Sequence, residues 1–326
     1  MQAIPKERVI YRRNKCYSAI GGPHHKGIAY ADQKAPCFIT GFGFPLADSF
    51  VLTLNPRMFL MWLNCRALIS FGGVFLCILV TGCSSPSPVS TGFRVMTYNI
   101  HHGEGIDGRI DLERIAAVIK KEKADIIALQ EVDRGVLRSG KRDIPAELGK
   151  LTGMSVFFEN NITYQGGEYG NAILTRLPVL SSTNTHYRML EPKEQRGVLQ
   201  LVLWLDGKSL LFLDTHLDYR DTGEPERLLH VETMKDLVKK HGNIPAIICG
   251  DFNATPDTGT YREMKKTFRD SWELSGEGKG LTIHSDKPLT RIDYIWISEQ
   301  VQSLKTWVPS TLASDHLPVV GEFRLR

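Results

Sequence analysis

The stretch Ile248-Cys249-Gly250-Asp251-Phe252-Asn253 decides how this chain is interpreted, because an apolar strand there ends in two polar side chains. Residues two apart in a strand share one face, so Asp251 and Asn253 are expected on the same side. A carboxylate can hold or deprotonate a water, and a carboxamide can donate hydrogen bonds to an oxygen that gains charge. This pair suits a phosphoryl centre, although Asp and Asn also occupy ordinary turns after strands.

Four further segments repeat the design of an apolar strand that meets polar side chains. Residues 93–100 end in Tyr98-Asn99-Ile100 before His101, residues 125–129 precede Gln130-Glu131-Val132-Asp133, and residues 210–213 precede Asp214-Thr215-His216-Leu217-Asp218. Residues 292–297 carry Arg291, Asp293 and Tyr294 at their start. The block Ser314-Asp315-His316-Leu317-Pro318 then precedes a last apolar strand.

In this order the blocks resemble the endonuclease/exonuclease/phosphatase superfamily, which includes deoxyribonuclease I, AP endonucleases, inositol polyphosphate 5-phosphatases and bacterial sphingomyelinases. The resemblance covers residues 93–326. It implies an α/β fold, a four-layer sandwich in which two packed mixed sheets are covered by helices. It also implies a metal-dependent hydrolase that cleaves a phosphoester.

The resemblance implies a metal site and a catalytic group. Glu131 is the principal metal ligand, with Asn99 beside it and Asp315 in the metal's neighbourhood. Oxygen ligands of this kind suit Mg²⁺, with Mn²⁺ as the alternative. The catalytic residues are expected to be Asp251, Asn253, His316, His216 and Asp293.

Each catalytic residue has an expected role. Asp251 positions or activates the attacking water, and Asn253 steadies the charge on the phosphoryl oxygens. His316 is a second candidate for the general base, its ring oriented by Asp293. His216 contacts the phosphate or assists the leaving group. The sequence leaves open whether Asp251 or His316 takes the proton.

Substrate contacts are expected from Arg196, Asn171 and His101. Arg196 is interpreted as a phosphate clamp because guanidinium presents a fixed fork of donors, with a surface ion pair as the alternative. His101 stands where AP endonucleases have an Asp that helps with metal, which weakens the transfer of that specific activity. His101 and His102 precede the flexible run Gly103-Glu104-Gly105, so one of them is expected to be a solvent-exposed loop histidine. No Glu near Arg196 aligns with the residue that would partner His216 in deoxyribonuclease I.

Helix and strand patterns agree with a layered α/β fold. Asp111 and Asp143 are predicted to cap two helices, and residues 224–240 form a third with an apolar stripe. Near-continuous apolar runs at 172–174, 198–205, 210–213 and 246–248 are predicted as buried strands. Asp206-Gly207-Lys208 is predicted to form a hairpin turn.

The first part of the chain is interpreted as a leader of three segments. Residues 67–80 form an apolar, uncharged run. The run has the length of a signal-peptide core but is short for a membrane span. Leu79-Val80-Thr81-Gly82-Cys83 resembles the bacterial lipobox. We therefore predict a non-native upstream extension or disordered leader at 1–57, a lipoprotein signal peptide at 58–82, a tether at 83–92 and the catalytic domain at 93–326.

Removal of the leader changes the charge and cysteine arguments. The whole chain has 40 Lys or Arg and 36 Asp or Glu, but residues 1–82 hold nine and three of these, which leaves a net −2. A basic balance that would suggest nucleic acid therefore disappears. Of six cysteines only the lipidated Cys83 and Cys249 remain, so the exported domain needs no disulfide.

The sequence thus predicts an exported lipoprotein anchored by Cys83 to the membrane of a bacterial cell envelope. Its expected reaction is Mg²⁺-dependent hydrolysis of a phosphoester, and the favoured substrate is a small or lipid-borne phosphodiester. An extracellular endonuclease is the alternative in the same class, so nucleic acid is a possible but not the favoured partner. A non-catalytic binding protein on the same scaffold is the alternative of another class. The oligomeric state does not follow from the sequence.

Overall fold

A computed structural model describes residues 92–326 with the exception of residue 243. The described residues belong to one compact unit. The predicted leader at 1–57, the signal peptide at 58–82 and all but the last residue of the tether lie outside the described residues. Within 92–326 no helix is long and apolar enough to span a membrane.

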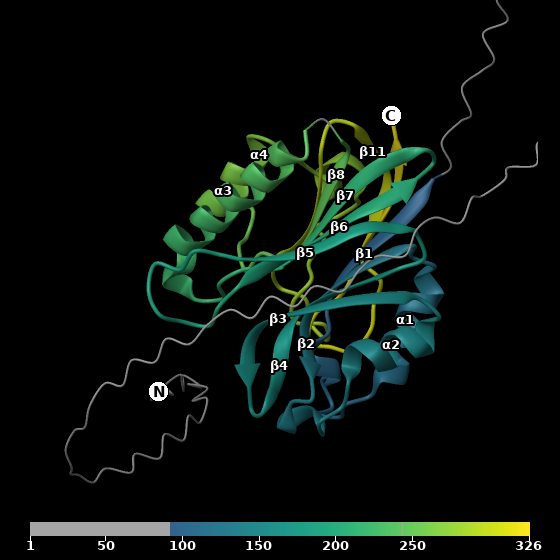
Figure 1. The fold of residues 1–326 in the computed structure, drawn as a ribbon, viewed down its shortest axis with the longest axis vertical. Coiled ribbons are helices and arrows are strands. Elements are labelled where there is room, and N and C mark those ends of the chain that lie inside the picture. The colour runs from purple at the N-terminus through teal and green to yellow at the C-terminus, as the bar shows by residue number, and fades with distance from the viewer. Residues whose placement is uncertain (1–91, 243) are drawn as a thin grey trace, which may run out of the picture. The chain divides into compact units, whose positions relative to one another are not determined.

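Two six-stranded mixed sheets form the centre of the domain (Figure 1). The first sheet holds, in spatial order, β11 (Val301–Trp307), β12 (Val319–Leu325), β1 (Phe93–Asn99), β2 (Ile126–Arg134), β4 (Gly167–Thr175) and β3 (Ser155–Tyr164). The second sheet holds β5 (Val179–His186), β6 (Gly197–Leu205), β7 (Lys208–His216), β8 (Ala246–Asp251), β10 (Asp293–Ile297) and β9 (Arg269–Asp270).

Helices cover the outer face of each sheet (Figure 1). The first sheet is covered by α1 (Leu112–Glu122) and α2 (Ile144–Thr152), and the second by α3 (Glu224–Lys240) and α4 (Gly259–Lys265). A short α5 (Ser271–Ser275) follows β9. Two of the predicted caps are present, since the Asp111 and Asp143 side chains accept backbone N–H groups three residues on.

Alternation along the strands builds three apolar interfaces. Val95 and Ile126 face the second sheet, whereas their neighbours Met96 and Ile127 pack under α1 and α2. In the second sheet Ile247 faces inward and Ile248 packs under α3 and α4. Three interfaces between four layers confirm the predicted α/β sandwich.

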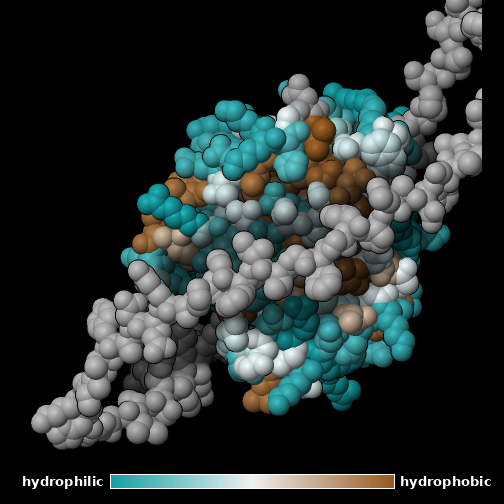
Figure 2. All heavy atoms as spheres, in the orientation of Figure 1, coloured by the Kyte–Doolittle hydropathy of each residue, from teal (hydrophilic) through white to brown (hydrophobic). Residues whose placement is uncertain are grey.

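The surface follows from this layering. On the face in Figure 2, hydrophilic side chains cover the outer helices, and hydrophobic ones gather over the sheet of β5, β6 and β7. Leu180 on β5 and Trp204 on β6 are among the exposed large apolar residues. The Lys120-Lys121, Lys239-Lys240 and Lys265-Lys266 pairs are exposed on or beside helices, as the sequence predicts.

Strand direction brings the polar strand ends to one edge of the sandwich. β1 pairs with β2 in parallel, and β7 pairs with β8 in parallel, so each pair ends at the same edge of its sheet. β10 runs antiparallel to β8 and therefore begins there. We call this the catalytic edge.

Some elements differ from the sequence prediction. β2 extends past residue 129 to Arg134 through a bulge between Leu129 and Val132. Asp206 and Gly207 make the predicted hairpin, both with positive φ, as a two-residue primed turn requires. The edge strands β3, β5, β9 and β11 carry many polar residues and therefore do not appear as apolar runs in the sequence.

Candidate active site

Asp251 is the centre of the catalytic edge because β8 ends there between two other strands. His216 of β7 and Asp293 of β10 are its direct neighbours in strand register. The Asp251 carboxylate lies 3.4 Å from His216 Nε2 and 3.7 Å from His316 Nε2. Four of the five predicted catalytic residues therefore meet around one carboxylate.

His316 and Asp293 form a buried pair. His316 Nδ1 lies 2.9 Å from Asp293 Oδ2, as expected for a carboxylate that orients the ring. Burial would lower the pKa of His316, but Asp293 and then Asp251 outweigh it and raise the pKa to about 10. At neutral pH this ring is therefore an imidazolium.

Burial has the opposite effect on the two groups beside this pair. Burial, with a further contribution from Asp293, raises the pKa of Asp251 to about 7. Burial also holds the pKa of His216 well below its usual range, reinforced by Arg196 and His316. Near pH 7, Asp251 can accept a proton while His216 stays neutral.

Asn99 connects the two sheets across the site. Its side-chain amide donates to Glu131 Oε1 at 3.2 Å and to Asp251 Oδ2 at 3.1 Å. Its Oδ1 atom accepts the backbone N–H of His101 at 3.0 Å. Asn99 thus lies beside Glu131 as predicted, but its N–H group and not its oxygen faces the carboxylate.

Left-handed backbone gathers at this edge. His101, His102, Glu131 and Asn253 have φ values between 43° and 57°, which non-glycine residues rarely adopt. Such conformations persist where the surrounding structure enforces them, and they cluster at functional sites. Glu131 obtains its position from the bulge in β2.

Asn253 reaches the site differently from the prediction. β8 ends at Asp251, so strand alternation does not extend to Asn253, and the turn rotates its side chain. Its amide donates to the Leu217 carbonyl at 3.2 Å, and its backbone N–H donates to Asp251 Oδ1 at 2.9 Å. The expectation that Asp251 and Asn253 share one strand face was wrong, because β8 ends at Asp251.

The predicted substrate-binding residues lie around the same edge. Arg196 forms an ion pair with Glu194 at 3.2 Å, as the alternative expected, but its guanidinium is only 4% exposed and so lies below the surface. Burial opposes the charge of Arg196, but Tyr169, Glu194, Glu131 and Asp251 keep its pKa raised. Arg196 is therefore a buried cation in the field of the site's carboxylates.

Asn171 and the loop residues complete the set. Asn171 lies buried on β4 opposite the bulge of β2, and its Oδ1 accepts a hydrogen bond from Asn161 Nδ2 at 3.0 Å. His101 Nδ1 lies 4.0 Å from Asp315 Oδ1. His102 is 6% exposed and His101 is half-buried, so the expectation that one of them is solvent-exposed was wrong.

The structure also shows residues that sequence reasoning left without a role. Gln130 Nε2 donates to Asp214 Oδ1 at 2.7 Å and joins the two sheets beneath the site. Burial raises the pKa of Asp214 well above its usual range, although hydrogen bonds from Gln130 and Asn171 oppose the shift. His102 Nε2 lies 3.4 Å from Glu104 Oε2. Each residue sits inside or directly after a recognised motif, and that position was the available signal.

The donor sets fit a divalent cation. A carboxylate oxygen of Glu131 and one ring nitrogen each of His101 and His102 lie within 4.8 Å of one another. Asp251, Asp293 and His316 form a second group of the same kind. The buried, unpartnered Nδ1 of His102 shows that the first group has a lone pair free for a ligand.

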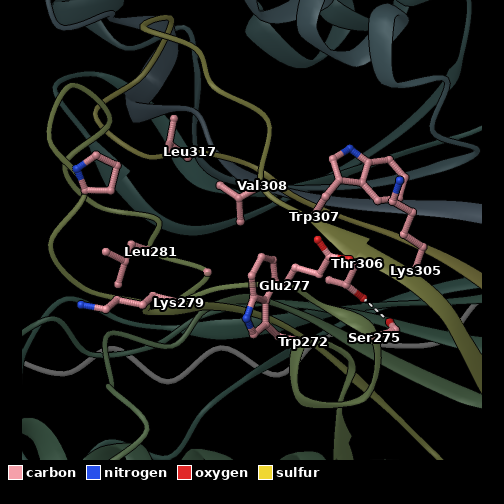
Figure 3. Close-up of a pocket in the computed structure, with 12 residues that line it drawn as sticks. Trp272, Ser275, Glu277, Lys279, Leu281, Lys305, Thr306, Trp307, Val308 and Leu317 are labelled. Carbon is pink, nitrogen blue, oxygen red and sulfur yellow. Dashed lines mark hydrogen bonds between the residues drawn. The ribbon is translucent and has the colours of Figure 1, made fainter.

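A pocket of about 530 Å³ lies between α5, the segment that follows it and the end of β11 (Figure 3). Trp272, Leu281, Val308 and Leu317 line it, with Lys279 and Lys305 on opposite sides. Leu317 follows His316 in the chain. Trp307 is level with Met96 in the middle of β1, and its ring contacts Glu122 and Arg94.

One residue joins the pocket wall to the catalytic pair. Thr282 follows Leu281, and its hydroxyl accepts the backbone N–H of Asp293 at 3.4 Å. Its carbonyl accepts the backbone N–H of Leu317 at 2.7 Å. The pocket and the His316–Asp293 pair therefore share the segments around Thr282 and Leu317.

A two-sheet sandwich with carboxylates, imidazoles and amides gathered at one edge defines a class of metal-dependent phosphoester hydrolases. The chain belongs to the Endonuclease/Exonuclease/phosphatase family, whose pattern it matches over residues 96–316. The family and the site make it a hydrolytic enzyme that cleaves phosphoesters.

Individual proteins are similar at a lower level. The uncharacterized protein YbhP of Escherichia coli K12 is 26% identical over 72% of this chain and 96% of its own length. Mouse 2',5'-phosphodiesterase 12 is 27% identical over 47% of this chain and 30% of its own length. A crystal structure of a family member from Bacteroides thetaiotaomicron superposes with a TM-score of 0.63 and 20% identity, covering 72% of this chain and 96% of that one.

Proposed function

We propose that this enzyme hydrolyses a small or lipid-borne phosphodiester in a Mg²⁺-dependent reaction, with Asp251 as the general base. The observation that carries the proposal is the position of Asp251. Its buried carboxylate has two imidazoles within 4 Å and a pKa of about 7. A general base is most effective when its pKa lies near the working pH.

These pKa values indicate which group accepts a proton and which donates one. Asp251 takes the proton of the attacking water, because His316 is already protonated at neutral pH. The His316 imidazolium, held by Asp293, donates a hydrogen bond to a phosphoryl oxygen as its charge grows. Neutral His216 contacts the leaving group. The proposal thus assigns the general base to the Asp251 carboxylate and not to His316.

Glu131 and Asp315 would hold Mg²⁺ at the same edge, with the Asn99 amide donating a hydrogen bond to Glu131 at 3.2 Å. The ion would neutralise the phosphate charge and polarise the phosphorus centre. Arg196 is buried beside these residues, with 4% of its surface exposed. Its fixed positive charge stabilises the negative charge of the phosphoryl group. Asn171, buried on β4 opposite the bulge that carries Glu131, would contact a phosphate oxygen through its side-chain amide.

The pocket lined by Leu281 and Leu317, whose chain neighbours contact the His316–Asp293 pair, supports a substrate with an organic group beyond the phosphate. Indole and aliphatic side chains suit an apolar body, and Lys279 and Lys305 suit an anionic or polar substituent. Its volume of about 530 Å³ is within the range of small-ligand sites. The phosphodiesterase name of the mouse relative is in accord with a diester.

An endonuclease remains the alternative. A nuclease gains affinity by neutralising several phosphates at once, which requires a basic groove. Residues 83–326 carry a net −2, with 31 basic and 33 acidic residues. The Lys pairs lie on helices and not around the site. The charge therefore favours one or two phosphates over a duplex.

The test is a substrate screen of the full-length protein. Inositol- and choline-containing phosphodiesters, phosphomonoesters and plasmid DNA are each assayed with Mg²⁺, with Mn²⁺ and with chelator. We expect a higher kcat/KM for a small or lipid phosphodiester, abolished by chelator. Efficient nicking of plasmid at moderate salt, with lipid head groups untouched, would favour the nuclease. Tight binding without turnover of any substrate would favour the non-catalytic alternative.

We also propose that Cys83 anchors the domain to a bacterial membrane after removal of residues 1–82. The lipobox-like sequence before Cys83 supports this, and the anchor would raise the local concentration of head groups at the site. The Cys83→Ala variant should lose labelled fatty acid and become soluble. Equal incorporation of label into both proteins would exclude the anchor. Export of a chain started at Met58 would support the assignment of residues 1–57 as an upstream extension.

A further inference from the structure

Exposed apolar side chains gather on the connections at the catalytic edge and are missing from those at the opposite edge. Six connections at the catalytic edge each carry one large apolar residue that is exposed, and we call these residues the apolar rim: Ile106, Leu137, Leu190, Tyr219, Leu289 and Leu312. The described residues of the opposite connections include no exposed large apolar residue, and these connections are 123–125, 153–154, 176–178, 206–207, 241–245 and 298–300.

We propose that the apolar rim docks on the surface of a phospholipid bilayer and turns the catalytic edge toward it. Apolar side chains that enter the boundary between head groups and acyl chains leave water, which stabilises the docked state. The link to a lipid-borne substrate rests on the proposed function, whereas the docking itself does not.

One part of the rim borders the site from the first sheet. The Ile106 backbone N–H donates to the Leu312 carbonyl at 3.3 Å, so these two residues lie on adjacent loops. Two residues after Leu312, the Ser314 hydroxyl donates to the Asn99 carbonyl at 2.7 Å. The loops that carry Ile106 and Leu312 are therefore attached directly to a residue of the site.

Another part of the rim borders the site from the second sheet. The Leu190 backbone N–H donates at 3.0 Å to Glu226 Oε1, in the first turn of α3. The Tyr219 ring centroid lies 6.0 Å from the guanidinium carbon of Arg196, which is buried among the carboxylates of the site. The rim thus stands on both halves of the sandwich, with the site residues between its two parts.

The chemistry of the rim suits lipid better than a protein partner. Its members are single side chains on separate loops, whereas the centre of a protein interface is a contiguous packed apolar patch. Two exposed basic residues accompany them, since Arg188 lies two residues before Leu190 and Lys287 two residues before Leu289. Aliphatic and tyrosine side chains beside Lys and Arg match acyl chains beneath lipid phosphates.

The rim would perform a task that an anchor at Cys83 does not. The chain enters the domain at Phe93, where β1 begins, and β1 begins at the edge opposite the catalytic edge. An anchor joined there holds the domain near a bilayer without facing the site toward it. Docking of the rim supplies that orientation.

Tryptophan substitutions in the full-length protein test which edge meets the lipid. Leu312→Trp and Leu190→Trp place an indole on the two parts of the rim, and Leu180→Trp places one on β5 near the opposite edge. The three leucines are 53%, 51% and 58% exposed, so the control is matched in residue type and exposure. Vesicles of phosphatidylcholine and phosphatidylglycerol are used with brominated or with unbrominated acyl chains. Bromine quenches indole emission only at short range, and wild-type emission is subtracted.

We expect bromine to quench the emission added by Leu312→Trp and by Leu190→Trp, but not that added by Leu180→Trp. The first 91 residues are the same in every sample, so they do not account for a difference between the two edges. In the Leu312→Trp protein, adding Ile106→Asn should lower the docking constant, measured from the quenched fraction, on the order of 5-fold. Adding Leu180→Asn instead should leave that constant unchanged. Circular dichroism checks that each variant is folded, and Leu190→Trp decides the matter if Leu312→Trp is not.

Equal quenching of all three added tryptophans, quenching of Leu180→Trp alone, or no quenching of either rim tryptophan would overturn the proposal. Self-association in light scattering, with the rim tryptophans unquenched by vesicles, would also overturn it and indicate a second copy of the chain as the partner. Hydrolysis of a soluble glycerophosphodiester is measured on the wild-type sample with Mg²⁺. Its absence would contradict the proposed function and leave the quenching result unaffected.

Discussion

Two groups of side chains meet at the catalytic edge, and the chain holds them in different ways. Asp251, Asp293 and His316 are buried and positioned by strand register and by a 2.9 Å contact between His316 and Asp293. His101 and Glu131 are partly exposed and stand on left-handed backbone. Burial sets the pKa values that proton transfer needs, whereas a strained, more open loop presents lone pairs to an ion. The first group is built for protons and the second for a cation.

The largest expected effect comes from removing the charge at the centre of the buried group. Asp251→Asn keeps the shape of the side chain but removes the proton acceptor, so turnover should fall on the order of 10² or more. Steady-state kinetics at saturating metal measure the change, and thermal unfolding checks the fold. The matched control is Asp236→Asn on the exposed side of α3, which should behave as wild type. Near-normal turnover of Asp251→Asn would transfer the base role to His316.

A change in the open group should alter the metal requirement instead. Glu131→Gln removes the negative charge that holds a hard cation, so the Mg²⁺ concentration for half-maximal rate should rise by about 10-fold or more. Activity is titrated against Mg²⁺ at fixed substrate. A rate at saturating Mg²⁺ that approaches wild type would sharpen the contrast with Asp251→Asn. Full activity at low Mg²⁺ would show that Glu131 is not a ligand.

The pH profile separates the roles of Asp251 and His316. In wild type the acid limb should fall as pH drops through about 7, where Asp251 is protonated, and the alkaline limb as pH rises through about 10, where His316 loses its proton. The Asp293 charge raises both pKa values, so Asp293→Asn should move both limbs to lower pH. The loss should reach about 10-fold at the alkaline end and be smaller near neutrality. Opposite shifts of the limbs, or none, would remove Asp293 from this role.

The smallest expected effect is on stability, at the contact that joins the sheets under both groups. Gln130→Leu leaves Asp214 and Thr97 without the amide that they contact at 2.7 and 3.1 Å. Buried polar groups without partners cost about 1–3 kcal/mol of unfolding free energy. Denaturant titration measures the change, and Gln302→Leu on exposed β11 should stay within about 0.5 kcal/mol. An unchanged unfolding free energy for Gln130→Leu would show that the sheets do not depend on this contact.

The central strands and covering helices could be predicted because burial on both faces leaves apolar runs in the sequence. β1, β7 and β8 show such runs, and α3 was predicted with the bounds that the structure has. The edge strands were missed because one neighbour and partial exposure leave them polar. β5 reads Val-Leu-Ser-Ser-Thr-Asn-Thr-His and is mostly exposed.

The site could be predicted where its residues follow strands, and less well where turns position them. His216, Asp251, Asp293 and His316 come together as expected, since strand register fixes the first three. His102 and Asn253 depend on left-handed turns, and periodicity does not encode such turns. The burial of His102 and its contact with Glu104 therefore required the structure.

Cys249 lies fully buried in the interface between the two sheets, two residues before Asp251. Burial raises the pKa of its thiol well above the usual range, so the thiolate that alkylating reagents attack is suppressed in the folded domain. From residue 84 onward it is the only cysteine of the sequence. The rate at which Cys249 is alkylated therefore reports how often the interface between the two sheets opens. Alkylation of Cys249 followed by mass spectrometry could measure the rate of that opening without any introduced probe.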